Sequence, residues 1–347
     1  MAYTTINKSS EHFNTKLYNG TGANQSITGV GFQPDFTWIK IRTTGFNHRL
    51  QDSVRGATKS LYTNLTNAEQ TNTDGVLSFD TDGFSLGDDA TNGSFNRSGD
   101  TFVSWNWLGG GTASSNTDGS ITSTVSANTT SGFSIVSYTG TGSNATVGHS
   151  LGSTPSMIIV KDRDGARNWT VYHKSIGATK WLQLDDTSAS QTGSPMWQDT
   201  EPTSSVFSIG TYAQINTSSS KYIAYCFAEK KGFSKFGSYT GNDNADGPFI
   251  YTGFKPAFTI LKRTDSADNW LMQDNKRKNP FNVVDTQLFP DLDNAESSSS
   301  AILDYCSNGF KIRKTGGNIN ASGGSYIYMA FAEAPLVGTN NVPCTAR

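Results

Sequence analysis

The sequence predicts an all-β protein built from three tandem β-sandwich units, and three features lead to this prediction. Short β-branched and aromatic runs are separated by turn signals such as Asn-Gly, Asp-Gly and Gly-Thr-Gly, which is the pattern of strands and turns. One arrangement of residues recurs three times along the chain. Helical periodicity is almost absent, and about six or seven strands in each unit of ~100 residues are typical of two packed sheets.

The three units share one register. In each unit a proline precedes an apolar run, a lysine follows the proline by six positions, and an asparagine follows it by thirteen. The three sets are Pro34, Lys40 and Asn47; Pro155, Lys161 and Asn168; and Pro256, Lys262 and Asn269. Because each lysine ends an apolar run, we expect it at a strand end that reaches solvent. Each unit closes with an aromatic strand, at 102–107, 222–227 and 326–331, which we expect to be central and buried.

These landmarks divide the chain into five segments. We predict β-sandwich units at 13–108, 133–231 and 233–336, a Gly/Ser/Thr-rich linker or hairpin at 109–132, and a C-terminal tail at 337–347. Few residues separate the second unit from the third, so we expect these two to abut stiffly. The longer segment after the first unit predicts slack there, with the three glycines at 109–111 as the hinge.

Length and composition agree with this fold and disfavour several classes of function. The chain has 347 residues, which at ~100–200 residues per domain suggests two or three folded units. Charged residues make up 16%, below the usual ~25%, and aromatic residues reach 12%. A net charge of −2 without a Lys/Arg cluster argues against nucleic acid and anionic membrane as partners.

Cysteine usage and the N-terminal sequence indicate a cytosolic origin. Cys226, Cys306 and Cys344 are too few and too scattered for a disulfide framework or a CxxC metal site, so we expect free thiols. The first ten residues contain no apolar stretch of the kind found in signal peptides, and no run approaches the ~18 apolar residues of a membrane span. We therefore expect no membrane insertion and synthesis in the cytoplasm.

Four motifs carry a resemblance to a known family. They are Gly-Phe-x-Pro-x-Phe-x-x-Ile-Lys at 31–40, Asp-Ser-Val-Arg-Gly-Ala-Thr-Lys at 52–59, Phe-Asp-Thr-Asp-Gly-Phe-Ser-Leu-Gly at 79–87 and Tyr-Met-Ala-Phe-Ala-Glu-Ala-Pro at 328–335. Together they resemble an uncharacterised repeat domain of virion structural proteins of tailed bacteriophages, particularly those of marine bacteria. The resemblance covers nearly the whole chain, from about residue 13 to 340–343.

This resemblance implies a jelly-roll or concanavalin-like sandwich exposed on a virus particle, in tail fibres or as a surface accessory. No catalytic residue comes with it. Unlike a complete long fibre, the chain shows no heptad coiled coil and no distinct N-terminal anchoring domain. That departure leaves room for a capsid decoration protein.

Three motifs with catalytic or metal-binding precedents have simpler interpretations. Gly-His-Ser-Leu-Gly at 148–152 matches a nucleophile elbow, but a proline and a strand follow where a helix is needed, so we interpret it as a turn. Asp80 with Asp82, and Asp162 with Asp164, have the alternate spacing of Ca²⁺ loops without completing that motif. Each Asp-Gly pair is more often a hairpin turn, and we expect no cofactor, with a structural Ca²⁺ as the alternative.

Aromatic and histidine residues give the candidate binding residues. Trp105, Trp107, Trp169 and Trp270 occupy repeated strand positions and are expected in the core, whereas Trp181 and Trp197 have no aromatic counterpart in the other units. We predict that Trp181 and Trp197 contact a ligand or partner, with His173 and Asp185 as hydrogen-bonding groups. The alternative is that the two rings pin a loop onto its own sandwich. The four histidines follow no repeated pattern and are expected at the surface or in turns.

The sequence therefore favours a non-enzymatic virion-surface structural protein, in the tail-fibre or receptor-recognition apparatus. A capsid decoration or head-fibre protein is the alternative, and a depolymerase of surface polysaccharide is the third hypothesis. Expected partners are other virion proteins, further copies of the chain and a host surface glycan or receptor.

Overall fold

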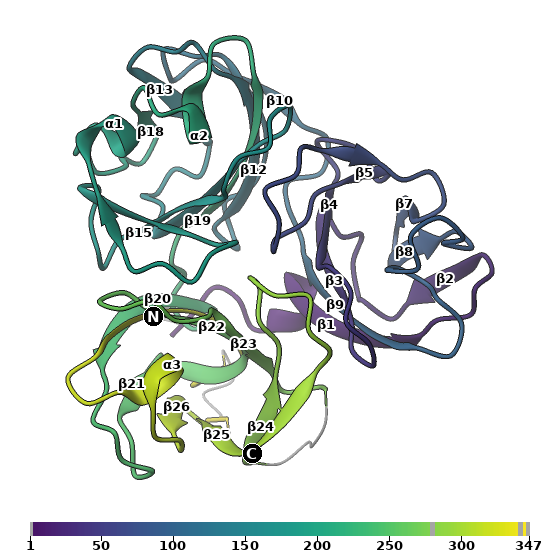
Figure 1. Ribbon diagram of the computed structural model, residues 1–347, viewed down its shortest axis with the longest axis vertical. Coiled ribbons are helices and arrows are strands. Elements are labelled where there is room, and N and C mark those ends of the chain that lie inside the picture. The colour runs from purple at the N-terminus through teal and green to yellow at the C-terminus, as the bar shows by residue number, and fades with distance from the viewer. Residues whose placement is uncertain (1–2, 278–281, 339–342, 345–347) are drawn as a thin grey trace.

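The computed structural model describes residues 3–277, 282–338 and 343–344 (Figure 1). The all-β prediction is confirmed, because the described chain is dominated by strands that pair antiparallel within their sheets. Three lobes surround a common centre, and each lobe corresponds to one of the three sequence units, 13–108, 133–231 and 233–336. We call these units 1, 2 and 3. Both chain ends lie at the lobe of unit 3.

Unit 1 is preceded by one 3-10 turn and contains nine strands. The turn is Ser9–Glu11, and the strands are β1 (Phe13–Asn19), β2 (Gln25–Thr28), β3 (Phe36–Ile41), β4 (Arg49–Asp52), β5 (Lys59–Ser60), β6 (Gln70–Thr71), β7 (Val76–Asp80), β8 (Gly83–Leu86) and β9 (Thr101–Trp107).

Unit 2 and the segment before it contain ten strands and two short helices. They are β10 (Ser114–Asn116), β11 (Ser123–Asn128), β12 (Phe133–Thr139), β13 (Ala145–Gly148), β14 (Met157–Asp162), β15 (Thr170–His173), β16 (Lys180–Gln183), β17 (Gln191–Thr192), α1 (Ser194–Trp197), β18 (Val206–Ile209), α2 (Ala213–Asn216) and β19 (Lys221–Phe227).

Unit 3 contains eight strands and one short helix among its described residues. They are β20 (Ser234–Thr240), β21 (Phe249–Tyr251), β22 (Phe254–Arg263), β23 (Leu271–Asp274), β24 (Val284–Gln287), β25 (Ser297–Cys306), β26 (Gly309–Ile312), α3 (Gly317–Asn320) and β27 (Ser325–Pro335). Among the described residues, no helix has the length and apolar character needed to cross a membrane.

Each unit contributes one sheet to the centre of the molecule, and the three sheets have corresponding strand orders. These inner sheets are β1-β9-β3-β4 in unit 1, β12-β19-β14-β15 within an eight-stranded sheet in unit 2, and β20-β27-β22-β23 in unit 3. The aromatic closing strands β9, β19 and β27 are each paired on both sides, so the prediction that they are central and buried is confirmed. One outer sheet lies over each inner sheet, with strand orders β2-β8-β7, β13-β18 and β21-β26-β25-β24.

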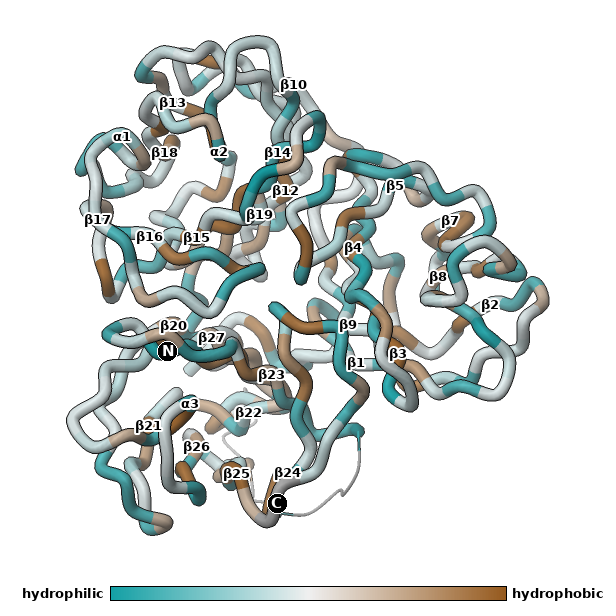
Figure 2. The backbone as a smooth tube through the Cα atoms, viewed as in Figure 1, coloured by the Kyte–Doolittle hydropathy of each residue, from teal (hydrophilic) through white to brown (hydrophobic). Residues whose placement is uncertain are grey.

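The three inner sheets face one another across a single hydrophobic core, which we call the common core (Figure 2). Its aromatic members are Phe13, Phe36, Trp38, Trp105 and Trp107 from unit 1, Phe133, Trp169, Tyr225 and Phe227 from unit 2, and Phe233, Phe236, Phe258, Trp270 and Phe331 from unit 3. The predicted core positions of Trp105, Trp107, Trp169 and Trp270 are thereby confirmed. Burial of this much aromatic surface holds the three lobes together.

Each inner sheet is buried on both faces. Trp38 in β3 belongs to the common core, while its neighbour Ile39 packs into a separate core between the inner and outer sheets of unit 1. Units 2 and 3 have separate outer cores of the same kind. Since successive side chains of a strand point to opposite faces, the apolar runs before Lys40, Lys161 and Lys262 supply both layers at once.

The segment 109–132 does not provide the slack expected after unit 1. Backbone N–H groups of Gly109 and Gly111 donate to the Asp35 carboxylate at 2.8 and 3.4 Å, and the Gly110 N–H donates to Ser126 Oγ at 2.9 Å. Further on, β10 and β11 pair and extend the inner sheet of unit 2 through β12. The prediction of a hinge at 109–111 is therefore wrong. The three glycines form a tight turn whose N–H groups are hydrogen-bonded to Asp35 and Ser126.

Tight hairpins explain the Asp-Gly and Asn-Gly pairs. A Cβ atom at Gly83 would lie 1.9 Å from the carbonyl oxygen of Ile27 on the neighbouring strand, and one at Gly309 would lie 2.1 Å from that of Ile250. Both contacts are far shorter than a Cβ tolerates. Glycine is needed at these positions because the outer strands pass directly over them.

Candidate functional site

The units meet at three junctions, which we call the 1–2, 2–3 and 3–1 junctions. At each junction the repeated lysine of one unit donates a hydrogen bond from Nζ to a backbone carbonyl oxygen of the unit before it. The pairs are Lys161 to Thr66 (3.0 Å), Lys262 to Thr187 (3.0 Å) and Lys40 to Asp293 (3.2 Å). Because the third contact runs from unit 1 back to unit 3, the three contacts connect the units in a closed ring.

The expectation that these lysines reach solvent is wrong, because all three are 0% exposed. Each ammonium group also donates to carbonyl oxygens of its own strand end, and these oxygens replace water. Burial lowers the pKa of Lys40 to about 7 and that of Lys161 and Lys262 to about 8, while neighbouring carboxylates act in the opposite direction. The lysines therefore serve the junctions and not the surface.

A backbone hydrogen bond also recurs at every junction, two residues after the lysine. The carbonyl oxygens of Arg163, Thr264 and Arg42 accept from the N–H groups of Glu69, Ser190 and Glu296 at 2.8, 2.9 and 2.8 Å respectively. These bonds connect backbone groups more than 70 residues apart in sequence. They define one relative orientation of neighbouring units, because a hydrogen bond weakens steeply when its geometry changes.

One aromatic position shows how the junctions differ in packing. Trp169 donates from Nε1 to the Tyr62 carbonyl oxygen at 2.7 Å, and Trp270 donates to that of Gln183 at 2.8 Å. The corresponding residue in unit 1 is the smaller His48, which accepts a hydrogen bond from Trp38 Nε1 at 2.9 Å. Trp38 occupies the register position that holds isoleucine in units 2 and 3, so the bulky ring moves to a neighbouring position while the core stays filled.

Two junctions contain a buried charged cluster. At the 1–2 junction Arg55 pairs with Asp52 and Glu69, and Glu69 also binds Arg163 of unit 2 at 2.8 and 3.0 Å. The hydroxyl of Tyr225, also from unit 2, donates to Asp52 at 2.8 Å. The motif at 52–59 therefore has a structural role, because it supplies the charges that bind unit 1 to unit 2.

The 3–1 junction repeats this cluster. Arg277 pairs with Asp274 at 2.6 Å and with Glu296 at 3.2 Å, and Glu296 binds Arg42 of unit 1 at 2.9 and 3.0 Å. Trp105 of unit 1 donates from Nε1 to Asp274 at 3.0 Å. Units 3 and 1 are not consecutive in sequence, so non-covalent contacts and not a connecting peptide hold this junction.

The 2–3 junction has the same backbone contact without the charges. His173 and Ile176 stand at the register positions of Asp52 and Arg55, and Ser190 meets Thr264 where the other junctions have a Glu–Arg pair. A short peptide connects units 2 and 3 directly. Among the described residues, the buried clusters of arginine and carboxylate therefore lie at the two junctions with a longer connection or none.

The structure does not place the four predicted site residues in an exposed ligand site. Trp181 and Trp197 are 4% and 2% exposed and belong to the outer core of unit 2, where Trp197 packs edge-on to Tyr172. His173 is buried in the 2–3 junction, with Nε2 3.1 Å from the Tyr328 carbonyl oxygen. Asp185 accepts hydrogen bonds from the Trp169 N–H and the Asn168 side chain. The two tryptophans pin their segment onto its own sheets, as the alternative interpretation held.

The expectation of surface or turn histidines also needs correction. His48, His149 and His173 are all buried. Burial lowers the pKa of His173 to about 4, and its Nδ1 accepts the Ser175 N–H at 3.1 Å, so the neutral ring donates from Nε2. Sequence alone could not show this, because each ring is enclosed by segments distant along the chain.

The carboxylate pairs with Ca²⁺-like spacing serve turns. Asp82 accepts from the N–H groups of Gly29 and Gly31, and Asp162 accepts from those of Asp164 and Gly165, at 2.7–2.9 Å. No group of three or more His, Cys, Asp or Glu side chains within the described ranges could hold a metal ion. The Ser150 hydroxyl accepts a hydrogen bond from Asn116 in the turn after β13, and the next element is β14.

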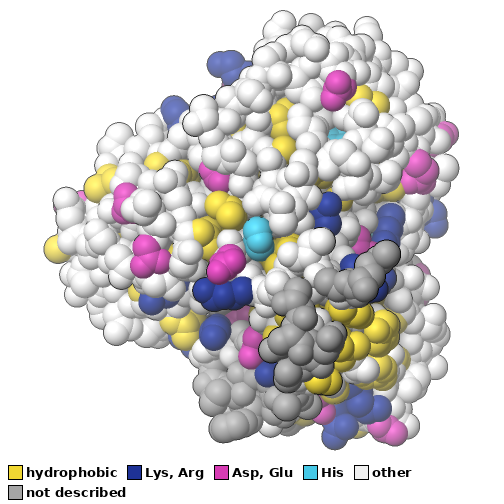
Figure 3. All heavy atoms as spheres, turned by 180° about the vertical axis from the view of Figure 1, so that it is seen from behind, with side chains coloured by type: hydrophobic (Ala, Val, Ile, Leu, Met, Phe, Trp, Pro, Cys, Tyr) yellow, Lys and Arg dark blue, Asp and Glu magenta, His cyan; other side chains and the backbone are white. Residues whose placement is uncertain are grey.

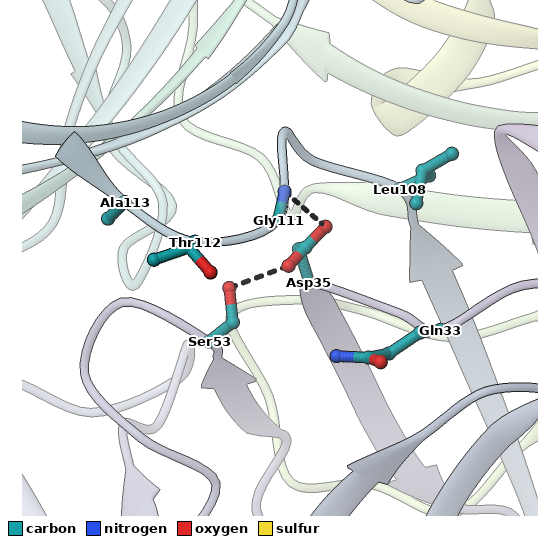
Figure 4. Close-up of a pocket in the computed structure, with 7 residues that line it drawn as sticks. All are labelled: Gln33, Asp35, Ser53, Leu108, Gly111, Thr112 and Ala113. Carbon is teal, nitrogen blue, oxygen red and sulfur yellow. Dashed lines mark hydrogen bonds between the residues drawn. The ribbon is translucent and has the colours of Figure 1, made fainter.

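A cleft of about 510 Å³ lies beside the 1–2 junction (Figure 4). Asp35 lies at its base, with one carboxylate oxygen accepting from Ser53 Oγ at 2.8 Å and the other from the glycine turn at 109–111. The remaining polar lining is neutral and includes Gln33 and Thr112. The Asp35 carboxylate is fully hydrogen-bonded within the protein, and the neutral polar groups around it can bind a polar group.

The carboxylate of Asp291 binds the backbone just before β23, and its burial predicts that the stability of the protein depends on pH. It accepts the Trp270 N–H at 3.2 Å, and its other oxygen has no hydrogen-bond partner among the described residues. Burial raises the pKa of Asp291 to about 7, despite the opposing effect of Lys262. The native state therefore keeps a proton that the unfolded chain releases near pH 4, and stability is lost as pH rises through 7.

We expect Asp291→Asn to become more stable than the wild type as pH rises from 4 to 7, by about 1–3 kcal/mol, with no further change above. Unit 1 already uses Asn64 for the corresponding contact to the His48 N–H. Urea unfolding at several pH values measures the difference, and Asp246→Asn, at an exposed carboxylate, is the control. A difference that stays constant across this range would contradict a buried neutral Asp291.

One comparison with known proteins gives a match. A family model described as a domain of unknown function (DUF7483) matches residues 8–335. The matched stretch contains all three units and all three junctions. No curated protein matches the chain.

Proposed function

The chain belongs to the DUF7483 family, and we propose that it is a non-enzymatic structural protein of the virion surface of a tailed bacteriophage. We further propose that it consists of three tandem β-sandwich units of jelly-roll or concanavalin-like type, closed into a ring. Its place is in the tail-fibre or receptor-recognition apparatus. The motif resemblance supports the virion assignment, and the three corresponding inner sheets support the repeat organisation.

The single observation that carries this proposal is the common core with its closed ring of junctions. Side chains from all three units, including residues as distant in sequence as Phe13 and Phe331, pack together, so the lobes cannot move independently without exposing aromatic surface. The buried arginines and carboxylates of the two charged clusters are paired with one another. A rigid body that presents loops of three lobes suits a protein that transmits contact at a particle surface better than an enzyme that must open and close.

A capsid decoration or head-fibre protein is the second candidate. The sequence contains no heptad pattern for a fibre shaft. In addition, three lobes around one centre would fit a mounting site with local threefold symmetry, because each lobe could meet an equivalent surface.

Immunogold electron microscopy tests both candidates. Antibodies against the purified chain are applied to purified particles of the phage that encodes it, with particles of an unrelated phage as the control. Gold at the tail tip or fibres supports the first candidate, and gold over the capsid faces supports the second. Absence of the chain from purified particles, by labelling and by mass spectrometry, would refute both.

A further inference from the structure

A second cleft, of about 310 Å³, lies beside the 2–3 junction and differs in chemistry from the Asp35 cleft. It is formed where β19 ends, where β20 begins and where β21 turns into β22. The N-terminal segment lies along its edge, because Tyr3 Oη donates to the Gly253 carbonyl oxygen at 2.6 Å and Thr4 Oγ1 donates to that of Lys231 at 2.7 Å. Four segments of the chain therefore build this cleft, which we call the tyrosine cleft.

Aromatic rings form one wall and rim of the tyrosine cleft. Tyr251 is 54% and Phe249 is 47% exposed, and among the described residues no other large hydrophobic side chains are as exposed. They lie two positions apart on β21 and so share the outward face of that strand. On the back of the molecule, hydrophobic side chains gather on the lobe of unit 3 near Lys and Arg side chains (Figure 3). Two large solvent-facing rings on one short strand are unusual on a surface otherwise rich in Ser, Thr and Asn, and the Tyr251 hydroxyl also hydrogen-bonds to Tyr3 at the cleft.

Positive charge forms the opposite wall. Glu229 is held between two ammonium groups, from Lys174 at 2.6 Å and from Lys235 at 2.7 Å. The ammonium group of Lys231 lies 4.5 Å from the centre of the Tyr3 ring. Three ammonium groups against one carboxylate leave a net positive charge at the cleft, whereas the whole chain carries −2. Because Glu229 holds Lys174 and Lys235 in place, part of this charge is already oriented for an anion.

We propose that the tyrosine cleft binds an acidic saccharide. The apolar face of a sugar ring stacks on Tyr251, and the sugar carboxylate pairs with Lys231 and Lys235. Tyr3, Ser234 and Thr252 line the same cleft, and because each hydroxyl already donates to a backbone carbonyl oxygen, its role toward a sugar hydroxyl group is that of an acceptor. Aromatic stacking beside convergent hydroxyl and ammonium groups favours this class over a purely apolar ligand. The inference deepens the proposed receptor-recognition role and rests on it for its biological meaning.

Isothermal titration calorimetry with the full chain tests the site. The probes are hexasaccharides of α-1,4-galacturonic acid, α-2,8-sialic acid and β-1,4-mannuronic acid, with neutral maltohexaose as the control. We expect at least one acidic probe to bind at least tenfold more tightly than maltohexaose, and the binding to weaken as salt is raised. Tyr251→Ala and Lys231→Met should each weaken that binding tenfold or more.

Tyr212→Ala is the matched control, because this exposed tyrosine lies on unit 2 away from the cleft. The Tyr212→Ala variant should bind the acidic probe as tightly as the wild type does. Thermal unfolding of each variant verifies that it is folded. Failure of all acidic probes to bind, equal binding of maltohexaose, or unchanged binding by Tyr251→Ala would each overturn the proposal. These outcomes are independent of the immunogold experiment, so loss of the saccharide site leaves the virion assignment standing.

Discussion

Replacing Phe331 by alanine should lower the free energy of unfolding by about 3–5 kcal/mol. Phe331 in β27 is buried, and its ring lies 5.1 Å from that of Phe13 in unit 1 and 6.1 Å from that of Phe227 in unit 2, measured between ring centres. The substitution removes a ring that all three units contact. Since the surrounding sheets are held by the junctions, they cannot collapse to fill the space, and the cavity adds to the lost burial.

Urea unfolding followed by tryptophan fluorescence measures this effect. Leu77→Ala is the control, because Leu77 is exposed on β7 and its loss should change stability by less than about 0.5 kcal/mol. If the common core joins the units as described, the Phe331→Ala variant should still unfold in a single transition at lower urea. A loss below about 1 kcal/mol would show that β27 is not central to the fold.

The strand class and the aromatic closing strands could be predicted from sequence because their signals are local. Alternation along β12 or β27 and the repeated tryptophans depend on neighbours within a few residues, and those neighbours were visible. The buried faces of β3 and β14 gave continuous apolar runs, and such runs indicate strands covered on both sides. The common core covers the second face of these strands, and its existence cannot be inferred from the sequence of one unit alone.

The junctions could not be predicted because their chemistry depends on residues far apart in sequence. Lys161 looks like a solvent-facing strand end until the Thr66 carbonyl oxygen of another unit is placed beside it. The Asp-Ser-Val-Arg motif contributed to the family resemblance without showing that Asp52 and Arg55 both contact Tyr225 of unit 2. The prediction for Trp197 was wrong for a related reason. This residue has no counterpart in the other units because it belongs to a core particular to unit 2, and not because it is exposed.

The common register of the units could nevertheless have identified one more contact that is repeated in all three. Asn96, Asn216 and Asn320 are buried at the end of each outer layer, and each donates from Nδ2 to two backbone carbonyl oxygens. Each also accepts an N–H from the first turn of its unit. Asparagine is too common in this sequence to stand out, so the signal lay in its fixed distance before the closing strand and not in its identity.

A second large loss of stability is expected at the 3–1 junction. Arg277→Ile should lower the free energy of unfolding by about 3–5 kcal/mol, because it leaves the carboxylate of Asp274 buried without its cationic partner. Asp274 and Arg277 side chains are both fully buried, and Glu296 loses one of its two arginine partners. The 2–3 junction shows what a neutral version requires, since Ile176 there accompanies His173 and a Ser190–Thr264 contact.

Exchanging the whole cluster for those neutral residues should therefore restore stability. The fourfold variant Arg42→Thr, Asp274→His, Arg277→Ile and Glu296→Ser removes every charge of the cluster, and we expect it to recover at least half of the loss. Arg313→Ile is the control, because Arg313 is 42% exposed in its pair with Asp304 and should cost less than about 1 kcal/mol. Chemical denaturation measures all three. A fourfold variant no more stable than Arg277→Ile would mean that the charged groups stabilise the ring closure themselves, and that the junctions are not interchangeable versions of one contact.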